Sequence, residues 1–121
     1  MKLYATEKIR NIGLIGHGGT GKTSLAEAML FHTGANNRIG RVDDDSSVMN
    51  YDAEEIKRKA TVNTSLAAIE YKDCKINLLD APGFDDFLGE VYKISGAIDM
   101  AIVTVNAQSG VEVGTEKNWA V

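Results

Sequence analysis

The stretch Gly-His-Gly-Gly-Thr-Gly-Lys-Thr, residues 16–23, decides the fold of this chain. It matches the phosphate-binding loop pattern G-x-x-x-x-G-K-[ST] at every fixed position. Residues 9–16 predict a buried strand in front of this loop, and residues 22–32 predict a helix behind it. The loop therefore lies between the two elements that it needs, and we expect it to bind a phosphate.

The residue types in the loop suit that task. Successive backbone N–H groups and a helix N-terminus attract phosphate charge, and glycines let the backbone approach it closely. Lys22 is expected to reach the β- and γ-phosphates, and the Thr23 hydroxyl is expected to bind Mg²⁺. His17 is expected to point outward without a catalytic role. The candidate nucleotide-binding residues here are Gly16, His17, Gly18, Gly19, Thr20, Gly21, Lys22, Thr23 and Ser24.

The composition predicts one domain of ordinary soluble type. A length of 121 residues suffices for one core, and a net charge of −4 gives no general attraction to nucleic acid or anionic membranes. The single cysteine, Cys74, cannot form an internal disulfide. No apolar run suits a signal peptide or a membrane span, so we expect a cytoplasmic protein without a membrane partner.

Residues 35–60 are strongly polar, and a segment of this length without predicted structure is uncommon in a compact domain. It is interpreted either as a solvated loop or as a switch that becomes ordered with a γ-phosphate and Mg²⁺. The run Asp43 to Asp45 suggests a metal site at first sight. Three adjacent side chains on an extended backbone alternate in direction, however, and a solvated loop is favoured.

The remaining chain predicts two antiparallel strands, a helix, a buried strand and a final helix. We expect the strands at residues 61–71, 75–80 and 98–105, and the helices at residues 85–97 and from Gly114 or Thr115 onward. Together with the first strand and helix, these elements predict an α/β phosphate-loop NTPase fold. It should be a three-layer sandwich with a mostly parallel sheet and one antiparallel edge strand.

A second motif, Asp80-Ala81-Pro82-Gly83, ends the strand at residues 75–80. In a phosphate-loop protein an aspartate here lies beside the Mg²⁺ shell, and the glycine N–H can reach the γ-phosphate. Phosphate-loop ATPases more often follow this aspartate with another acid. Ala81 therefore favours a GTPase over an ATPase or kinase.

Beyond the phosphate loop and the Asp80–Gly83 motif, several other residues carry a wider resemblance. They are Ser24, Gly34-Ala35, Gly40-Arg41-Val42, Val48-Met49, Thr61, Asp86-Phe87, Gly89-Glu90 and Gly110-Val111-Glu112. The whole chain resembles the GTP-binding domain of the elongation factor G family of translational GTPases, more closely its elongation-factor-G-like branch. The resemblance implies GTP or GDP and Mg²⁺ as ligands, and the ribosome as partner of the full-length protein.

The resemblance also implies roles for single residues. Thr23 and Thr61 would bind Mg²⁺ directly, Asp80 would hold it through water, and the Gly83 N–H would sense the γ-phosphate. The chain departs from the family pattern at Gly19, usually Asp, and at residues 58–61, which usually read Arg-Gly-Ile-Thr. It also has Phe84 where a histidine normally orients the attacking water. Phenylalanine offers no hydrogen bond, so slow hydrolysis is expected.

The resemblance divides residues 1–121 into a phosphate loop (16–23), switch I (35–63) and switch II (80–90) of a single partial G domain. The Asn/Thr-Lys-x-Asp segment that selects guanine does not occur here, so we expect a first portion of a G domain that stops before its later strands. Residues 98–105 would then expose an apolar strand edge and favour self-association. Two functions stay open: a slow GTPase switch, or a module that binds nucleotide or phosphate without useful hydrolysis.

Overall fold

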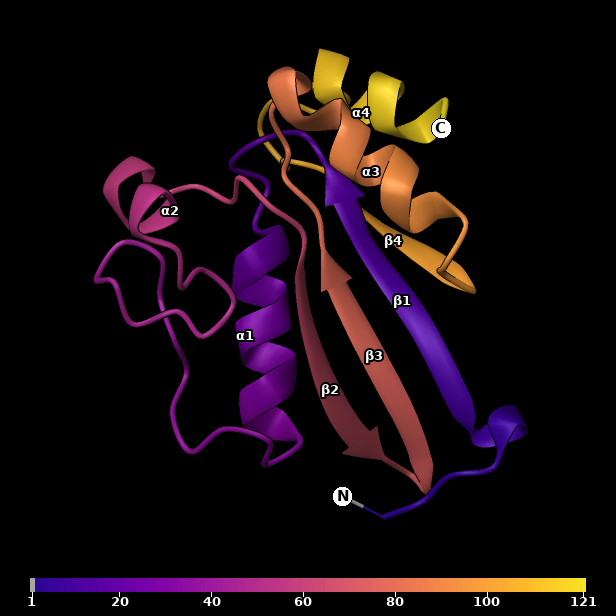
Figure 1. Cartoon of the computed structure of the whole chain (residues 1–121). Coiled ribbons are helices and arrows are strands. Elements are labelled where there is room, and N and C mark those ends of the chain that lie inside the picture. The colour runs from indigo at the N-terminus through magenta and orange to yellow at the C-terminus, as the bar shows by residue number, and fades with distance from the viewer. Residues whose placement is uncertain (1) are drawn as a thin grey trace.

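The computed structural model describes residues 2–121, and its centre is one four-stranded sheet. The strands are β1 (Ile9–Gly16), β2 (Ser65–Tyr71), β3 (Cys74–Asp80) and β4 (Met100–Thr104), in the order β2-β3-β1-β4. β1 runs parallel to β3 and β4, while β2 runs antiparallel to β3 (Figure 1). The predicted mostly parallel sheet with one antiparallel edge strand is confirmed.

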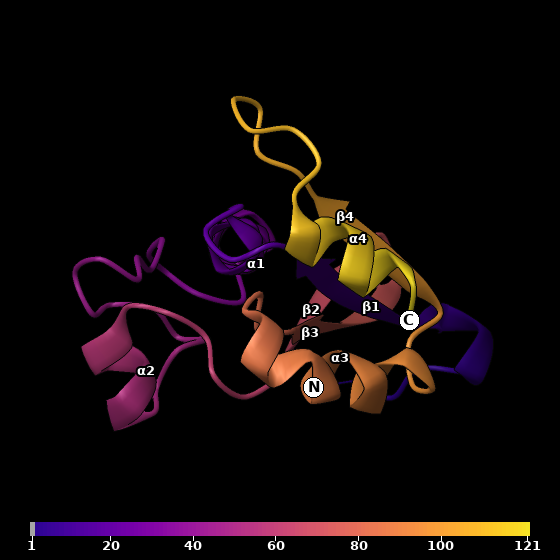
Figure 2. The same ribbon diagram turned by 90° about the horizontal axis from the view of Figure 1, so that it is seen from above.

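Helices cover both faces of the sheet, which makes three layers (Figure 2). α1 (Lys22–His32) packs on one face, and α3 (Leu88–Ser95) and α4 (Val113–Trp119) pack on the other. Leu14 belongs to the core under α1, whereas its neighbour Ile15 belongs to the core under α3, because successive strand residues point to opposite faces. Within residues 2–121, no helix has the length and hydrophobicity required to cross a lipid bilayer.

Several element boundaries differ from those that the sequence predicts. β2 begins at Ser65 rather than at residue 61, because the amides of residues 62–64 donate to the carboxylates of Glu55 and Glu90 instead of to a strand. The helix expected over 85–97 is a short 3₁₀ turn, Asp85–Phe87, followed by α3. The strand expected over residues 98–105 is shorter in the structure, where β4 comprises Met100–Thr104. A further 3₁₀ turn, Thr6–Lys8, precedes β1.

α4 begins earlier than expected. Its N-cap is Glu112, not Gly114 or Thr115, because the Glu112 and Thr115 side chains each bond to the other residue's backbone N–H. This reciprocal arrangement is a capping box, which satisfies two backbone donors that a helix start leaves free.

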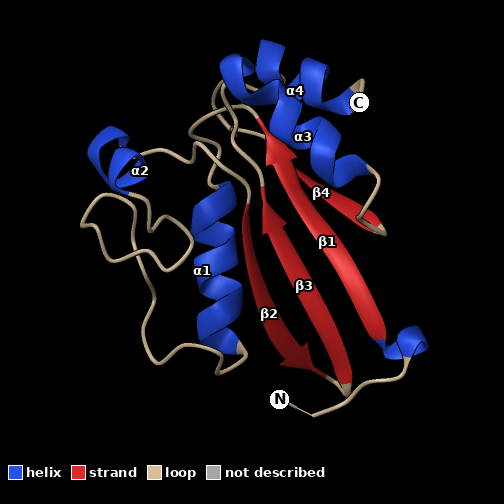
Figure 3. Ribbon diagram, viewed as in Figure 1, coloured by secondary structure: helices blue, strands red, loops and turns tan. Residues whose placement is uncertain are grey.

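The polar segment contains a helix that the sequence analysis did not predict, α2 (Ala53–Arg58), which lies beyond α1 (Figure 3). Asp52 caps it by accepting from the Glu54 N–H at 2.8 Å, and Lys59 ends it in the left-handed conformation. Asp43 to Asp45 are exposed, as expected for a solvated run. Met49 nevertheless joins the core under α1, so the segment is not a solvated loop throughout.

Candidate functional site

The predicted phosphate loop connects the end of β1 to the start of α1, at the carboxyl edge of the parallel strands. Open α/β sheets bind ligands at this edge. Gly19 and Gly21 have φ angles of +78° and +90°. These values lie in the left-handed region, where glycine meets no steric penalty. Nothing lies within 4 Å of a Cβ built at either position, so conformation rather than crowding explains both glycines.

Lys22 is held in the mouth of this loop. Its Nζ donates to the backbone oxygens of Gly16 at 3.0 Å and His17 at 2.8 Å. Burial lowers the pKa of the Lys22 ammonium, and the nearby Asp80 charge opposes that shift. A cation with only carbonyl partners remains able to bind an incoming anion, since it has no ion pair to break.

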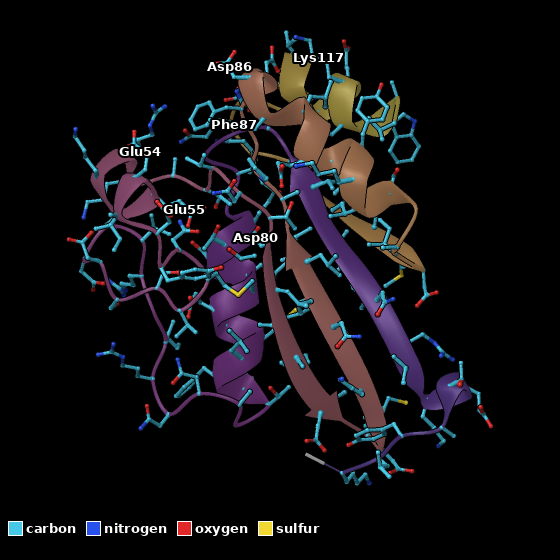
Figure 4. The ribbon with its side chains drawn as sticks, in the orientation of Figure 1. Glu54, Glu55, Asp80, Asp86, Phe87 and Lys117 are labelled. Atoms are coloured by element: carbon cyan, nitrogen blue, oxygen red, sulfur yellow. The ribbon has the colours of Figure 1, made fainter. Side chains whose placement is uncertain are left out.

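Three oxygen-bearing side chains converge beside the lysine. Thr23 Oγ1 donates to Asp80 Oδ2 at 2.5 Å and lies 3.0 Å from Thr61 Oγ1. They come from α1, the end of β3 and the loop before β2, and Figure 4 shows Asp80 near the upper end of α1. The structure thus brings together all three residues that the sequence analysis assigned to Mg²⁺.

Asp80 is fully buried, and burial is the main cause that raises the pKa of its carboxyl to about 6. The Thr23 hydrogen bond and the Lys22 charge lower that pKa, whereas Glu55 and Glu27 raise it further. Asp80 Oδ1 has no hydrogen-bond partner. A buried carboxylate oxygen without a partner is costly, so an additional positive or donating group belongs here.

The donor set suits Mg²⁺, which takes oxygen ligands and keeps several waters and phosphate oxygens in its shell. The protein offers the hydroxyls of Thr23 and Thr61 and the carboxylate of Asp80, and water and phosphate oxygens would complete the shell. Among residues 2–121, no group of three or more His, Cys, Asp or Glu could hold a metal ion. Thr23, Thr61 and Asp80 fit an ion that also takes oxygens from water or phosphate.

A cleft of about 450 Å³ opens above these residues. Of the predicted site residues, Gly18, Gly19, Gly21, Lys22, Thr23, Ser24, Thr61 and Gly83 line it. Phe84 also lines it. So do residues that the sequence did not indicate as site residues: Arg41, Val42, Asp43, Asn50, Arg58, Lys59 and Ala60. They belong to the polar segment, whose composition indicates no particular partner.

Gly83 and Phe84 also line the cleft. A Cβ at Gly83 would lie 2.7 Å from the Gly18 backbone nitrogen and would also collide with Lys22 Nζ. The Phe84 ring packs on Gly18, where a Cβ would lie 3.1 Å from Phe84 Cε1. Position 84 therefore adjoins the phosphate loop, and it presents an aromatic ring without a hydrogen-bonding group there.

The four remaining predicted residues, Gly16, His17, Thr20 and Asp80, are not among the residues that line the cleft. The His17 side chain does not simply point outward as expected. Its Nδ1 accepts from the Gly114 N–H at 3.2 Å, and its Nε2 lies 3.7 Å from Glu112. Thr20 Oγ1 bonds to the His17 carbonyl and to Thr104, each at 2.7 Å. These contacts connect the loop to α4 and β4.

Comparison with known proteins gives relatives along almost the entire chain. The model of the elongation factor Tu GTP binding domain matches residues 7–121. Elongation factor G of Petrotoga mobilis is 38% identical over 118 residues, which cover 98% of this chain and 17% of that protein. The mitochondrial ribosome-releasing factor 2 of Kluyveromyces lactis is 39% identical over 124 residues, covering 98% and 16%. The chain spans about one sixth of the length of these relatives.

Solved structures of related proteins are similar to this chain. A crystal structure of a Thermus thermophilus protein superimposes with a TM-score of 0.90 at 43% identity, covering 93% of this chain and 17% of that one. Elongation factor SelB of Methanococcus maripaludis, solved with the GTP analogue GppNHp, gives a TM-score of 0.67 at 22% identity, over 98% and 19%. The second likeness shows the fold alone. The resemblance to the elongation factor G group is confirmed, and the chain belongs to the family of the elongation factor Tu GTP binding domain.

Proposed function

We propose that this chain is the Mg²⁺-dependent guanine-nucleotide switch of an elongation-factor-G-like translation factor whose intrinsic GTP hydrolysis is slow. The observation that carries the proposal is the convergence of Thr23, Thr61 and Asp80 beside the phosphate loop. Thr61 is 38 residues away from Thr23 in sequence. A turn that resembled a phosphate loop by accident would have no reason to gather these oxygens.

In this proposal residues 16–24 hold the phosphates, and Lys22 pairs with the β- and γ-phosphate oxygens. Thr23 and Thr61 bind Mg²⁺ directly, Asp80 orients a water in its shell, and the Gly83 N–H donates to the γ-phosphate. Mg²⁺ supplies positive charge that neutralises the phosphate oxygens. Switch I comprises residues 35–63 and switch II residues 80–90.

Slow hydrolysis follows from Phe84. A group that positions the attacking water contributes on the order of 10²- to 10⁴-fold in rate, and a phenyl ring cannot do so. Single-turnover hydrolysis by the full-length protein, with and without ribosomes, tests this point. Rapid hydrolysis without ribosomes would refute the slow-switch proposal.

Phe84 also favours a second candidate, a module that binds nucleotide or phosphate and never hydrolyses it usefully. Titrating fluorescent GTP, GDP and ATP against the full-length protein in the presence of Mg²⁺ tests the nucleotide class. We expect binding of guanine nucleotides with a loss of affinity on Mg²⁺ removal. A preference for ATP would contradict the proposal that the protein is a guanine-nucleotide switch.

The proposed partner of the full-length protein is the ribosome, and the proposed compartment is the cytoplasm. Support for the ribosome as partner comes from the names of the relatives, which describe an elongation factor and a mitochondrial ribosome-releasing factor. We also propose that the chain self-associates through β4, which pairs with β1 on one side and is an edge of the sheet within residues 2–121.

A further inference from the structure

Glu27 is a buried charge-bearing side chain that the proposed site does not use. It lies on α1 one turn after Thr23 and is completely shielded from solvent. A buried carboxylate must be compensated by donors, because its transfer from water is otherwise very costly. Glu27 is not among the residues that line the cleft, and its hydrogen-bond partners lie elsewhere.

All the donors to Glu27 come from the polar segment. Its Oε1 accepts from Ser47 Oγ at 2.7 Å and from the backbone N–H groups of Val48 at 2.6 Å and Met49 at 3.0 Å. Hydrogen bonds to an ionised acceptor are stronger than neutral ones. Three of them on one oxygen hold a short stretch of switch I, residues 47–49, against α1.

The other carboxylate oxygen, Oε2, has no hydrogen-bond partner among residues 2–121 and faces Gly40. A Cβ at position 40 would lie 2.5 Å from Glu27 Oε2 and 2.7 Å from the Ser46 carbonyl oxygen, so a larger residue does not fit without a shift. Glu27 therefore contacts two separate parts of the same segment, before and after the acidic run.

A chain of hydrogen bonds continues from this anchor to the proposed metal ligand. The Asn50 N–H donates to Ser47 Oγ at 3.2 Å, and Thr61 Oγ1 donates to Asn50 Oδ1 at 3.1 Å. Thr61 Oγ1 then lies 3.0 Å from Thr23 Oγ1. The hydrogen-bond chain thus runs from Glu27 on α1 to Thr61, whose hydroxyl lies beside Thr23, four positions before Glu27 on the same helix.

We propose that Glu27 is the positioning residue of switch I: it fixes residues 47–50 on α1, and they in turn hold the Thr61 hydroxyl beside Thr23. This inference rests on the proposed function, because it gives Thr61 a role at the nucleotide. Glu27 then matters for the triphosphate state, in which Thr61 takes part, and not for the binding of a diphosphate to the phosphate loop.

The test compares Glu27→Gln and Ser47→Ala with Glu116→Gln, which removes an exposed carboxylate on α4 and serves as the matched control. Circular dichroism first confirms that each variant folds. Amide hydrogen exchange of Val48 and Met49 then reports the anchor without any nucleotide. Fluorescence titration with Mg²⁺ reports the ratio of affinities for a non-hydrolysable GTP analogue and for GDP.

We expect both test variants to exchange these two amides at least about tenfold faster than the control variant. The affinity for the GTP analogue should fall about tenfold, because the variants no longer hold Thr61 in place for the triphosphate state. The affinity for GDP should change less than about twofold, because Thr61 takes no part in binding the diphosphate. Unchanged exchange, or an equal loss for both nucleotides, would overturn the proposal. If the unmodified chain binds neither nucleotide, the proposed function fails, and the exchange rates alone decide whether Glu27 anchors the segment.

Discussion

Asp80→Asn separates the charge of the buried aspartate from its shape. The carboxyl of Asp80 has a pKa of about 6 in the folded chain, mainly because of burial, against an ordinary value of 3.8. The folded state therefore holds the Asp80 proton more tightly than the unfolded state does. The stability that this proton supplies is fully present below pH 3.8 and is lost as the pH rises through 6.

The size of the effect follows from the difference between the two pKa values. A shift of one pKa unit corresponds to about 1.4 kcal/mol, so the difference between the two pKa values corresponds to about 3 kcal/mol in total. An asparagine keeps the acceptor for Thr23 but does not ionise, and it should lack this pH dependence. From pH 4 to pH 8, the free energy of unfolding of the unmodified chain should fall by about 2 kcal/mol relative to that of the variant, because at pH 4 the unfolded carboxyl is already partly ionised.

Urea unfolding of both proteins, followed by circular dichroism in the absence of nucleotide and Mg²⁺, measures this difference. Other titrating groups cancel because the comparison is made at each pH between two otherwise identical chains. A difference that stays constant with pH, or that grows in favour of the unmodified chain at high pH, would refute the account of Asp80 as a buried carboxylate.

Three other perturbations test the cleft and the sheet. Phe84→His should raise single-turnover GTP hydrolysis by the full-length protein about 10²-fold, because it restores a group that can orient water beside Gly18; no increase would show that position 84 does not limit the rate. Gly83→Ala should weaken binding of a non-hydrolysable GTP analogue at least about tenfold in fluorescence titrations, because its methyl group meets Lys22 Nζ and the Gly18 backbone; retained affinity would argue against the close approach of switch II to the phosphate loop. Ala101→Lys, an exposed position on β4, should reduce self-association in light scattering at tens of micromolar, since edge lysines oppose strand pairing; a monodisperse monomer before mutation would contradict the predicted edge contact.

The elements around the phosphate loop were predictable to the residue. β1 and α1 have the predicted bounds because an apolar run, four glycines and Lys22 each restrict the local backbone in the same direction. The structure also places Asp80, which the motif at the end of its strand indicated, and Thr61, which the family resemblance implied, beside Thr23. Whether they bind Mg²⁺ stays a prediction.

The polar segment was less predictable, because tertiary contacts determine its structure. α2 has only six residues, although Asp52 followed by Glu54 and Glu55 was a capping signal that could have indicated it. Figure 4 shows Glu55 on the side of α2 toward α1. Glu55 is buried and its neighbour Glu54 is exposed, although the two side chains are chemically identical. The burial of Glu27 was not predictable from the sequence either, because glutamate is rarely buried and the helix pattern indicates a surface position.

The two carboxylate anchors also have an entropic consequence. α1 ends at His32 and β2 begins at Ser65. Without further contacts, the entire connection between them would have to be ordered when it closes over a bound phosphate. Glu27 fixes residues 47–49, and Glu55 Oε1 accepts from the N–H groups of Val62 and Asn63 at 2.9 and 3.1 Å. Glu55 lies on α2, so its bonds close a short loop inside the connection itself. The connection is thereby divided into shorter loops, and the closure entropy of each is smaller by on the order of 1 kcal/mol than that of the undivided connection. A long connection can thus close at nearly the entropic cost of a short one.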